Sequence, residues 1–241
     1  MDRHGTVVIN GGTNLDPLYV PCGLYKSDPG SDEVEVIADR RLASDPVFVS
    51  FKFGSTFKIA SIVDGIAAFE ADIKLFPGDL CGCCLDGFGA KLGAIWLYDG
   101  ETIKQIVSWN TKPRDAPNFI SALSVPDSDG AGFVAFWANA SAYRHHHEGI
   151  YRYYRGELRK IADFETIIPG TDQKFASFIG NGPVSRPVSI RGDIVAFQGA
   201  PDLTLFNVGI YVWVAGELVK LIAPGDELGD QTVATRLPLA L

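Results

Sequence analysis

The segment GIYRYYRGELRKIAD at residues 149–163 returns 60 residues later as GIYVWVAGELVKLIA at residues 209–223. Seven residues are identical in the two copies: Gly149, Ile150, Tyr151, Gly156, Glu157, Leu158 and Lys160. Each copy has two runs rich in β-branched and aromatic residues around a glycine, which is typical of two strands joined by a tight turn. A repeat at this spacing predicts an architecture built from similar units.

Two weaker copies lie upstream, where Gly23-Leu24-Tyr25 and Ala94-Ile95-Trp96 hold the place of Gly-Ile-Tyr. An apolar strand precedes each copy, at residues 7–9, 67–69, 134–136 and 195–197. A further strand precedes the last three of these, at residues 59–63, 122–125 and 187–190. The sequence therefore predicts four units of short antiparallel strands.

Units of four such strands, with no segment of helical periodicity, match the blades of a β-propeller. We expect an all-β fold in which residues 1–241 form one propeller domain of four blades, each of about 60 residues. The predicted blades are residues 5–58, 59–121, 122–186 and 187–241.

The first blade lacks its innermost strand, because the chain enters the apolar strand directly after Thr6. The segment at residues 232–241 lies where the next innermost strand is due, so its pairing with the first blade would close a ring of four blades. The alternative is that the chain is a segment of a larger repeat protein.

The order of these motifs resembles the blades of TolB-like propellers, and still more closely the tandem-repeat propellers of secreted bacterial proteins. In the latter a Pro-Gly and a Phe-x-Ser-Phe segment follow the third strand, as Pro169-Gly170 and 175–178 do here. Residues 48–51 repeat the second motif, whereas Ala94 departs from the glycine of the pattern. The resemblance implies a secreted or cell-surface protein, and it supplies no catalytic residues.

Composition narrows the function classes. The net charge of −8 argues against a nucleic-acid partner, because phosphate binding requires a basic surface. No stretch approaches the roughly 20 apolar residues of a membrane span. No signal peptide precedes the first strand in residues 1–6. The sequence therefore leaves either a cytoplasmic protein or a leader that this chain lacks, and it indicates no cofactor.

The connections between the first and second strands of the units vary most, at residues 10–22, 70–93, 139–148 and 199–208. In a propeller these connections emerge on one face, and binding residues concentrate on variable loops of a rigid scaffold. They hold every cysteine of the chain, namely Cys22, Cys81, Cys83 and Cys84, and three of the four histidines. We expect a ligand site at this face.

Three interpretations compete for the cysteines. A disulfide from Cys22 to a cysteine of the second loop would join neighbouring blades, as suits a secreted protein. Free thiols are the second interpretation. A zinc or copper site is the third, which we favour least because Cys-Gly-Cys-Cys at residues 81–84 is not the usual Cys-x₂-Cys spacing.

His145 and His147 could share one side of an extended strand, which suggests a metal site with Cys81 and Cys83. We favour a polar, solvent-facing loop, in which these histidines contact a ligand without metal. Trp109 and Tyr143 lie outside the repeated columns and are the better candidates for an exposed stacking surface.

No acid, base or nucleophile recurs with the repeat. Asp127 and Asp129 resemble the start of a calcium loop without its remaining ligands, so we predict a hairpin turn there. Carboxylates at Asp163 and Asp226 follow the third strands as turn residues. We therefore expect a non-enzymatic module that binds a glycan or protein. The alternative is a glycosidase or metal-dependent hydrolase with its site at the mouth of the central channel.

Overall fold

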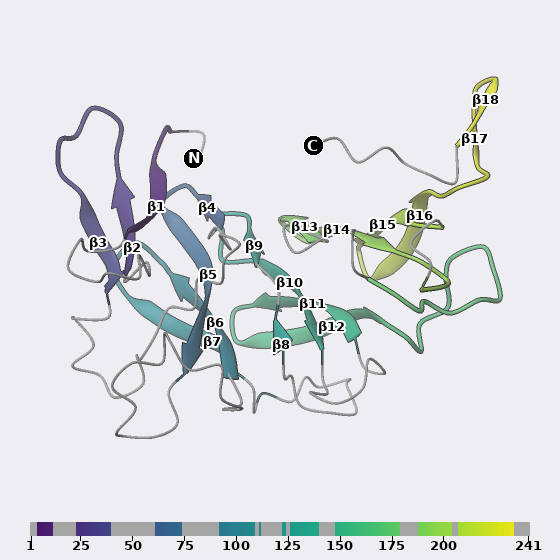
Figure 1. The fold of residues 1–241 in the computed structure, drawn as a ribbon, viewed down its shortest axis with the longest axis horizontal. Coiled ribbons are helices and arrows are strands. Elements are labelled where there is room, and N and C mark those ends of the chain that lie inside the picture. The colour runs from purple at the N-terminus through teal and green to yellow at the C-terminus, as the bar shows by residue number, and fades with distance from the viewer. Residues whose placement is uncertain are drawn as a thin grey trace.

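The computed structural model describes residues 4–11, 23–39, 61–73, 92–108, 111, 122–123, 126–139, 148–178, 188–203 and 207–233. These residues contain strands and turns but no helix. All strand pairs in them are antiparallel, so the expected all-β class is confirmed for the part of the chain that the structure describes (Figure 1).

Four sheets follow one another along the chain, and in the first, second and fourth sheets the strands pair in chain order. The first sheet contains β1 (Val7–Gly11), β2 (Gly23–Ser27) and β3 (Glu35–Asp39). The second contains β4 (Ser61–Val63), β5 (Ile66–Ile73), β6 (Leu92–Tyr98) and β7 (Ile103–Ser108).

The third sheet contains β8 (Ala122–Leu123), β9 (Asp127–Ser128), β10 (Val134–Asn139), β11 (Glu148–Tyr154) and β12 (Glu157–Asp163). The fourth contains β13 (Val188–Arg191), β14 (Ile194–Gly199), β15 (Gly209–Val214) and β16 (Glu217–Ile222). A small hairpin of β17 (Glu227–Leu228) and β18 (Gln231–Thr232) follows. The order of strands is the one the repeat predicts, except in the third sheet, where β8 and β9 both pair with β10 and β9 lies where the sequence predicts a turn.

A β-bulge recurs at one position in all four sheets, where the last two strands pair. In the third sheet Ile150 pairs with Ala162 and Tyr151 with Lys160, which leaves Ile161 as the extra residue. The equivalent extra residues are Ile37, Ile106 and Leu221. A bulge bends its strand and increases the local twist, so each sheet carries the same bend at the same height.

Two-residue turns with positive φ join several strands. Arg155 and Gly156 have φ of 49° and 89°, and Ala215 and Gly216 have φ of 53° and 90°. Such turns match the twist of the flanking strands. The sequence predicts these turns one residue later, at Gly156-Glu157 and Gly216-Glu217. The prediction differs from the structure because arginine and alanine seldom adopt positive φ.

The sheets pack face to face in chain order, so each has a forward face toward the next sheet and a rear face toward the preceding one. Leu24 and Ile37 on the forward face of the first sheet pack with Phe69 and Trp96 of the second. The next two interfaces repeat this arrangement. Their buried members are Ala68, Ile95, Val107, Val134, Phe136, Ala138 and Tyr151, then Ala135, Ile150, Ile161, Val195, Phe197, Tyr211 and Trp213.

The row of sheets has two ends. The first and fourth sheets lie at its opposite ends (Figure 1). The predicted C-terminal strand that would close a ring falls mostly on residues 234–241, outside the described residues. Four blades of a propeller and the proposed blade boundaries therefore stay predictions, whereas the antiparallel sheets of four strands are observed.

In the third and fourth units, the glycine two residues before the tyrosine is required because the tyrosine ring lies too close to leave room for a side chain. A Cβ added to Gly209 would lie 2.8 Å from the hydroxyl of Tyr211 and 3.1 Å from Cβ of Ala223. The tyrosine is buried and cannot move aside freely. In the second unit Ala94 replaces this glycine and Trp96 replaces the tyrosine. A different pair of residues therefore occupies the two positions in its sheet.

We expect Gly209→Ala to lower the free energy of unfolding by about 1–2 kcal/mol, because the added methyl group overpacks the site. Urea unfolding followed by tryptophan fluorescence measures this change. Adding Tyr211→Phe removes the closest atom, so the double variant should regain part of the loss. An unchanged unfolding midpoint in Gly209→Ala would contradict the steric explanation.

Candidate functional site

The long connections of the sheets start and end at one end of the strands, which we call the loop end. Gly11 pairs with Gly23, and Gly199 with Gly209, so each first strand finishes beside the start of its partner. The four connections between these strands hold 8 to 18 residues, whereas the turns at the opposite end hold two to seven. The connections between successive sheets also leave from the loop end.

All the ligand residues that the sequence predicts belong to these connections. Cys22, Cys81, Cys83, Cys84, Tyr143, His145 and His147 belong to the connections between first and second strands, and Trp109 to the one between the second and third sheets. All eight lie outside the described residues, so the disulfide, thiol, metal and stacking interpretations stay predictions. Their common origin at the loop end follows from the strand pairing.

A buried carboxylate stands at the base of the histidine-containing connection. Glu148, the first residue of β11, is 3% exposed, and its Oε2 accepts a hydrogen bond of 3.3 Å from the indole Nε1 of Trp137. Trp137 lies on the paired strand β10. Sequence analysis missed Glu148, because the other units have cysteine, glycine or valine in its place and the repeat pattern gives no signal.

At the loop end of the fourth sheet, the structure describes several residues of the connection that follows β14. Ala200 pairs with Ser177, so the segment after the third sheet is attached to the end of β14. Beyond it, the Nδ2 of Asn207 donates a hydrogen bond of 2.6 Å to Asp202, and Leu203 is 74% exposed. The loop end therefore presents both polar and apolar groups to solvent.

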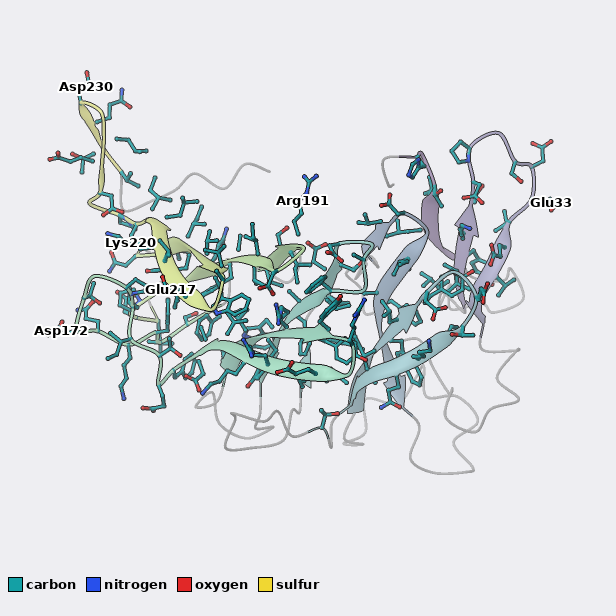
Figure 2. The ribbon with its side chains drawn as sticks, turned by 180° about the vertical axis from the view of Figure 1, so that it is seen from behind. Glu33, Asp172, Arg191, Glu217, Lys220 and Asp230 are labelled. Atoms are coloured by element: carbon teal, nitrogen blue, oxygen red, sulfur yellow. The ribbon has the colours of Figure 1, made fainter. Side chains whose placement is uncertain are left out.

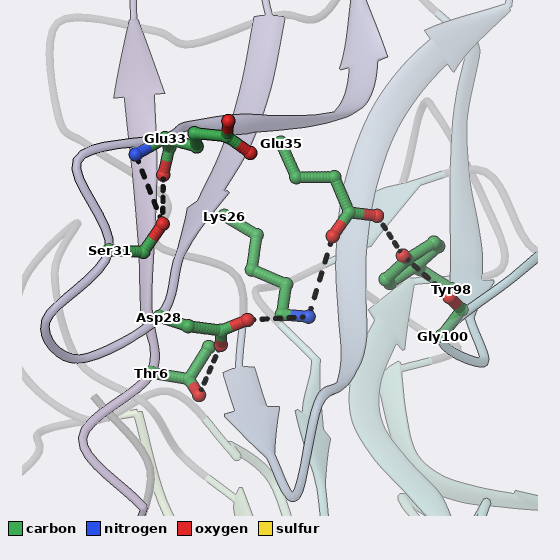
Figure 3. A network of polar contacts seen from close by, with 8 residues as sticks. All are labelled: Thr6, Lys26, Asp28, Ser31, Glu33, Glu35, Tyr98 and Gly100. Atoms are coloured by element: carbon green, nitrogen blue, oxygen red, sulfur yellow. Dashed lines mark hydrogen bonds and ion pairs between the residues drawn. The ribbon is translucent and has the colours of Figure 1, made fainter.

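A shallow hollow lies at the opposite end, on the hairpin of β2 and β3. Most of its lining residues take part in the network of polar contacts in Figure 3. Its volume is about 320 Å³, and its lining residues are Lys26, Asp28, Ser31, Glu33, Val34 and Glu35. The Nζ of Lys26 lies 3.3 Å from Asp28 and 3.4 Å from Glu35. Asp28 also accepts a hydrogen bond of 2.8 Å from the hydroxyl of Thr6.

The second sheet takes part in this network. The hydroxyl of Tyr98 donates to Glu35 over 2.5 Å, which joins the first two sheets. Burial, followed by this hydrogen bond, raises the pKa of Tyr98 to about 12. Burial lowers the pKa of Lys26, but its hydrogen bond to Asp28 and the charge of Glu35 outweigh that effect and raise it. Three charged residues that line the hollow, Lys26, Asp28 and Glu35, thus already pair with one another.

The two carboxylates weighed as catalytic residues form ion pairs within their sheets. Lys160 Nζ lies 2.7 Å from Asp163, and Lys220 Nζ lies 2.6 Å from Asp226. The two lysines are equivalent in the repeat, but the aspartates are not. Asp163 is the last residue of β12, whereas Asp226 lies four residues after the end of β16. Asp163 also accepts hydrogen bonds from Glu165 and Thr166 of the following turn, and Asp226 accepts one from the amide of Ala223, three residues before it. Both carboxylates are therefore structural groups.

Asp163 is the more buried of the two, with 9% exposure. Burial raises the pKa of this carboxyl, but hydrogen bonds from Lys160 and Thr166 outweigh burial and lower it. A lowered folded pKa means that the stabilisation is fully present above the unfolded value of about 3.9. The stabilisation is lost as the pH falls through the folded pKa.

We therefore expect unfolding to become easier below about pH 4, and Asp163→Asn to reduce that pH dependence. At pH 7 the variant should lose about 1–2 kcal/mol, because bonds to an ionised group become neutral ones. Urea unfolding between pH 3 and pH 7 gives both quantities. Identical pH profiles for the wild type and the variant would contradict this role for Asp163.

Two aspartates of the third sheet, one in a strand and one in a turn, contact the fourth sheet. Asp127 Oδ2 accepts hydrogen bonds of 3.0 Å from both the hydroxyl of Ser189 and the amide of Ile190. Asp129 Oδ2 accepts one of 2.8 Å from the amide of Gly192. Of the two aspartates that resemble the start of a calcium loop, Asp129 lies in the predicted turn, whereas Asp127 lies in strand β9. Both link the third sheet to the fourth.

The described residues contain no group of three or more histidine, cysteine, aspartate or glutamate side chains that could hold a metal ion. Their ionisable clusters are ion pairs within or between sheets. In this part of the chain, the arrangement offers structural pairing rather than groups converging on a shared pocket.

Among the described residues, no helix is long and apolar enough to cross a membrane. In comparisons with known proteins, the chain matches no protein-family model and no curated protein.

Proposed function

We propose that this chain is a recognition module built from four propeller blades, which binds a carbohydrate or a protein through the connections at the loop end. The observation that carries this proposal is the contrast between the two ends of the sheets. Long connections of unequal length leave one end, and short turns close the other. Binding residues concentrate on variable loops held by a rigid scaffold.

The equivalence of the sheets supports the propeller fold. The same strand order, bulge and face-to-face contact recur from sheet to sheet, as expected of blades. A ring closed within one chain and a ring completed by another chain are both compatible with this arrangement. The resemblance to secreted repeat propellers supports a secreted or cell-surface location.

Aromatic residues of the long connections are the proposed contact groups. Trp109 and Tyr143 belong to connections that leave from the loop end. Aromatic rings stack on sugar rings and also anchor protein interfaces. His145 and His147 would add hydrogen bonds at the same end.

The test is retention of the purified chain on insoluble cellulose, chitin and xylan, with reducing ends measured in the supernatant. We expect retention on one of these polysaccharides without release of reducing ends, and loss of retention in Trp109→Ala/Tyr143→Ala. Tyr154→Ala, an aromatic change at the opposite end, is the matched control.

Release of reducing ends would overturn the non-enzymatic proposal in favour of the hydrolase. No retention on any of the three polysaccharides would overturn the proposal that the chain binds them, and a protein would then be the remaining proposed ligand. Equal retention by the double variant and the wild type would contradict the assignment of the aromatic residues.

A further inference from the structure

Exposed apolar side chains concentrate on two sheet faces. Nine large hydrophobic residues among those described are well exposed. Five of them lie on the rear face of the first sheet or the forward face of the fourth, which no described sheet covers. They are Val36 on the first sheet, and Ile194, Val214, Val219 and Leu221 on the fourth.

In the first and third sheets, the residues equivalent to those of the open face of the fourth sheet are buried against the next sheet. The bulge residues Ile37 and Ile161 are 5% and 8% exposed, because the next sheet covers them. Their equivalent Leu221 is 66% exposed. Similarly, Ile150 is fully buried, whereas the equivalent Ile210 is only half-buried. The forward face of the fourth sheet is therefore built like an interface that lacks its partner.

The rear face of the first sheet has the matching composition. Val7 and Tyr25 are equivalent to Val195 and Tyr211, which pack on the forward face of the third sheet. Val36 lies beside Tyr25 across the strand pair and extends the same face. At each of the three described interfaces, the apolar forward face of one sheet packs against the apolar rear face of the next.

We propose that the forward face of the fourth sheet binds the rear face of the first sheet in a second copy of this chain. The proposal rests on the propeller arrangement proposed above. Figure 2 shows why one chain does not supply both halves of the contact: Glu217 and Lys220 of the fourth sheet lie at one end of the row, and Glu33 lies at the other.

Such a contact is head to tail, since each chain uses a different face for each neighbour. Head-to-tail contacts either close into a ring or continue into a filament. Two chains of four sheets each close into a ring of eight with twofold symmetry, and eight blades lie within the usual range for propellers. Both open faces of both chains are then covered.

This interface differs in charge from the described ones. Glu35 bonds to Tyr98 between the first two sheets, and Arg152 forms an ion pair with Asp193 between the last two. At the corresponding height the fourth sheet has Val212 and Val219, which would face Ser27 of the second copy. The contact is apolar there, so its affinity should change little between low and moderate salt.

The test is the mass of the full chain in solution, measured with reductant by light scattering across a concentration series. We expect the wild type to reach twice the 26.0 kDa of one chain, and Leu221→Arg and Val36→Arg each to stay at 26.0 kDa. Leu228→Arg is the matched control, because Leu228 is 60% exposed but lies on β17, off this face. It should leave the doubled mass unchanged.

Mixing the two single variants separates this contact from a symmetric one. Leu221→Arg keeps an intact first sheet and Val36→Arg an intact fourth sheet, so the mixture should regain the doubled mass through one interface. This recovery also shows that neither variant has lost its fold. Failure of the mixture to recover, with both variants giving a native circular dichroism spectrum, would overturn the proposal.

Two other results would overturn it as well. A wild type that stays at 26.0 kDa at all concentrations, with a lower unfolding midpoint in Leu221→Arg, would mean closure within one chain. A mass that rises without limit would mean open filaments. Polysaccharide retention by Leu221→Arg reports separately on the proposed function, because the loop-end aromatic residues are unchanged in that variant.

Discussion

Replacing Phe175 by alanine is expected to lower the free energy of unfolding by about 3–5 kcal/mol, the usual cost of removing a buried phenylalanine. Phe175 is 2% exposed and belongs to the segment that leads from the third sheet to the fourth. Its ring meets Tyr211 edge-on at 4.8 Å and lies 5.0 Å from Phe178. The side chain thus packs this segment against the fourth sheet.

Gly199 makes room for this ring, because a Cβ there would lie 2.7 Å from it. Urea unfolding followed by tryptophan fluorescence measures the effect of Phe175→Ala. Leu203→Ala serves as the control, since an exposed side chain should change the free energy by no more than about 0.5 kcal/mol. Equal effects of the two substitutions would show that Phe175 does not hold the connecting segment against the fourth sheet.

The second large effect is expected at the contact between Arg152 and Asp193. Arg152 on β11 is 8% exposed, and it forms an ion pair with Asp193 in the turn of the fourth sheet. Its guanidinium also lies 4.8 Å from the ring of Trp213 and 5.5 Å from that of Phe133. Burial, and then the charge of Arg159, lower the pKa of Arg152.

We expect Asp193→Ala to cost about 2–4 kcal/mol, because it leaves a buried cation without its carboxylate. The figure lies below that of a fully buried pair because the side chain of Asp193 is 53% exposed. Arg152→Met should cost less, since it removes the charge and keeps an apolar stem. The double variant should resemble Arg152→Met alone.

A double-mutant cycle in urea measures these differences. Asp99→Ala is the comparison, because Asp99 pairs with the exposed Lys104 at 2.7 Å and a surface pair contributes less than about 1 kcal/mol. A cost for Asp193→Ala no larger than that for Asp99→Ala would contradict the buried-charge argument.

The sequence predicts the strands well because their apolar columns repeat. The strand pairs that begin at Gly149 and Gly209 form with the expected direction. The bulge escaped prediction, because the extra isoleucine or leucine looks like any other strand residue. Only the pairing of Ile150 with Ala162 across the sheet shows that Ile161 is extra.

Contacts between sheets were the harder part to foresee. Asp129 and Gly192 are neighbours in space but 63 residues apart, and nothing in either turn indicates the other. The pairing of Lys160 and Lys220 with aspartates from different positions also breaks the repeat. The repeat predicts that the connections lie together at the loop end. It does not predict the positions of the residues within them, because the connections differ in length and share no sequence pattern.

Hydrogen exchange followed by mass spectrometry on the full chain tests most directly the central claim that one repeated unit forms four sheets stacked face to face. The account predicts slow exchange in four separate blocks, centred on β2, β6, β11 and β15, with the two middle sheets no less protected than the outer two. Protection confined to the third and fourth sheets, with rapid exchange throughout β2 and β6, would contradict it.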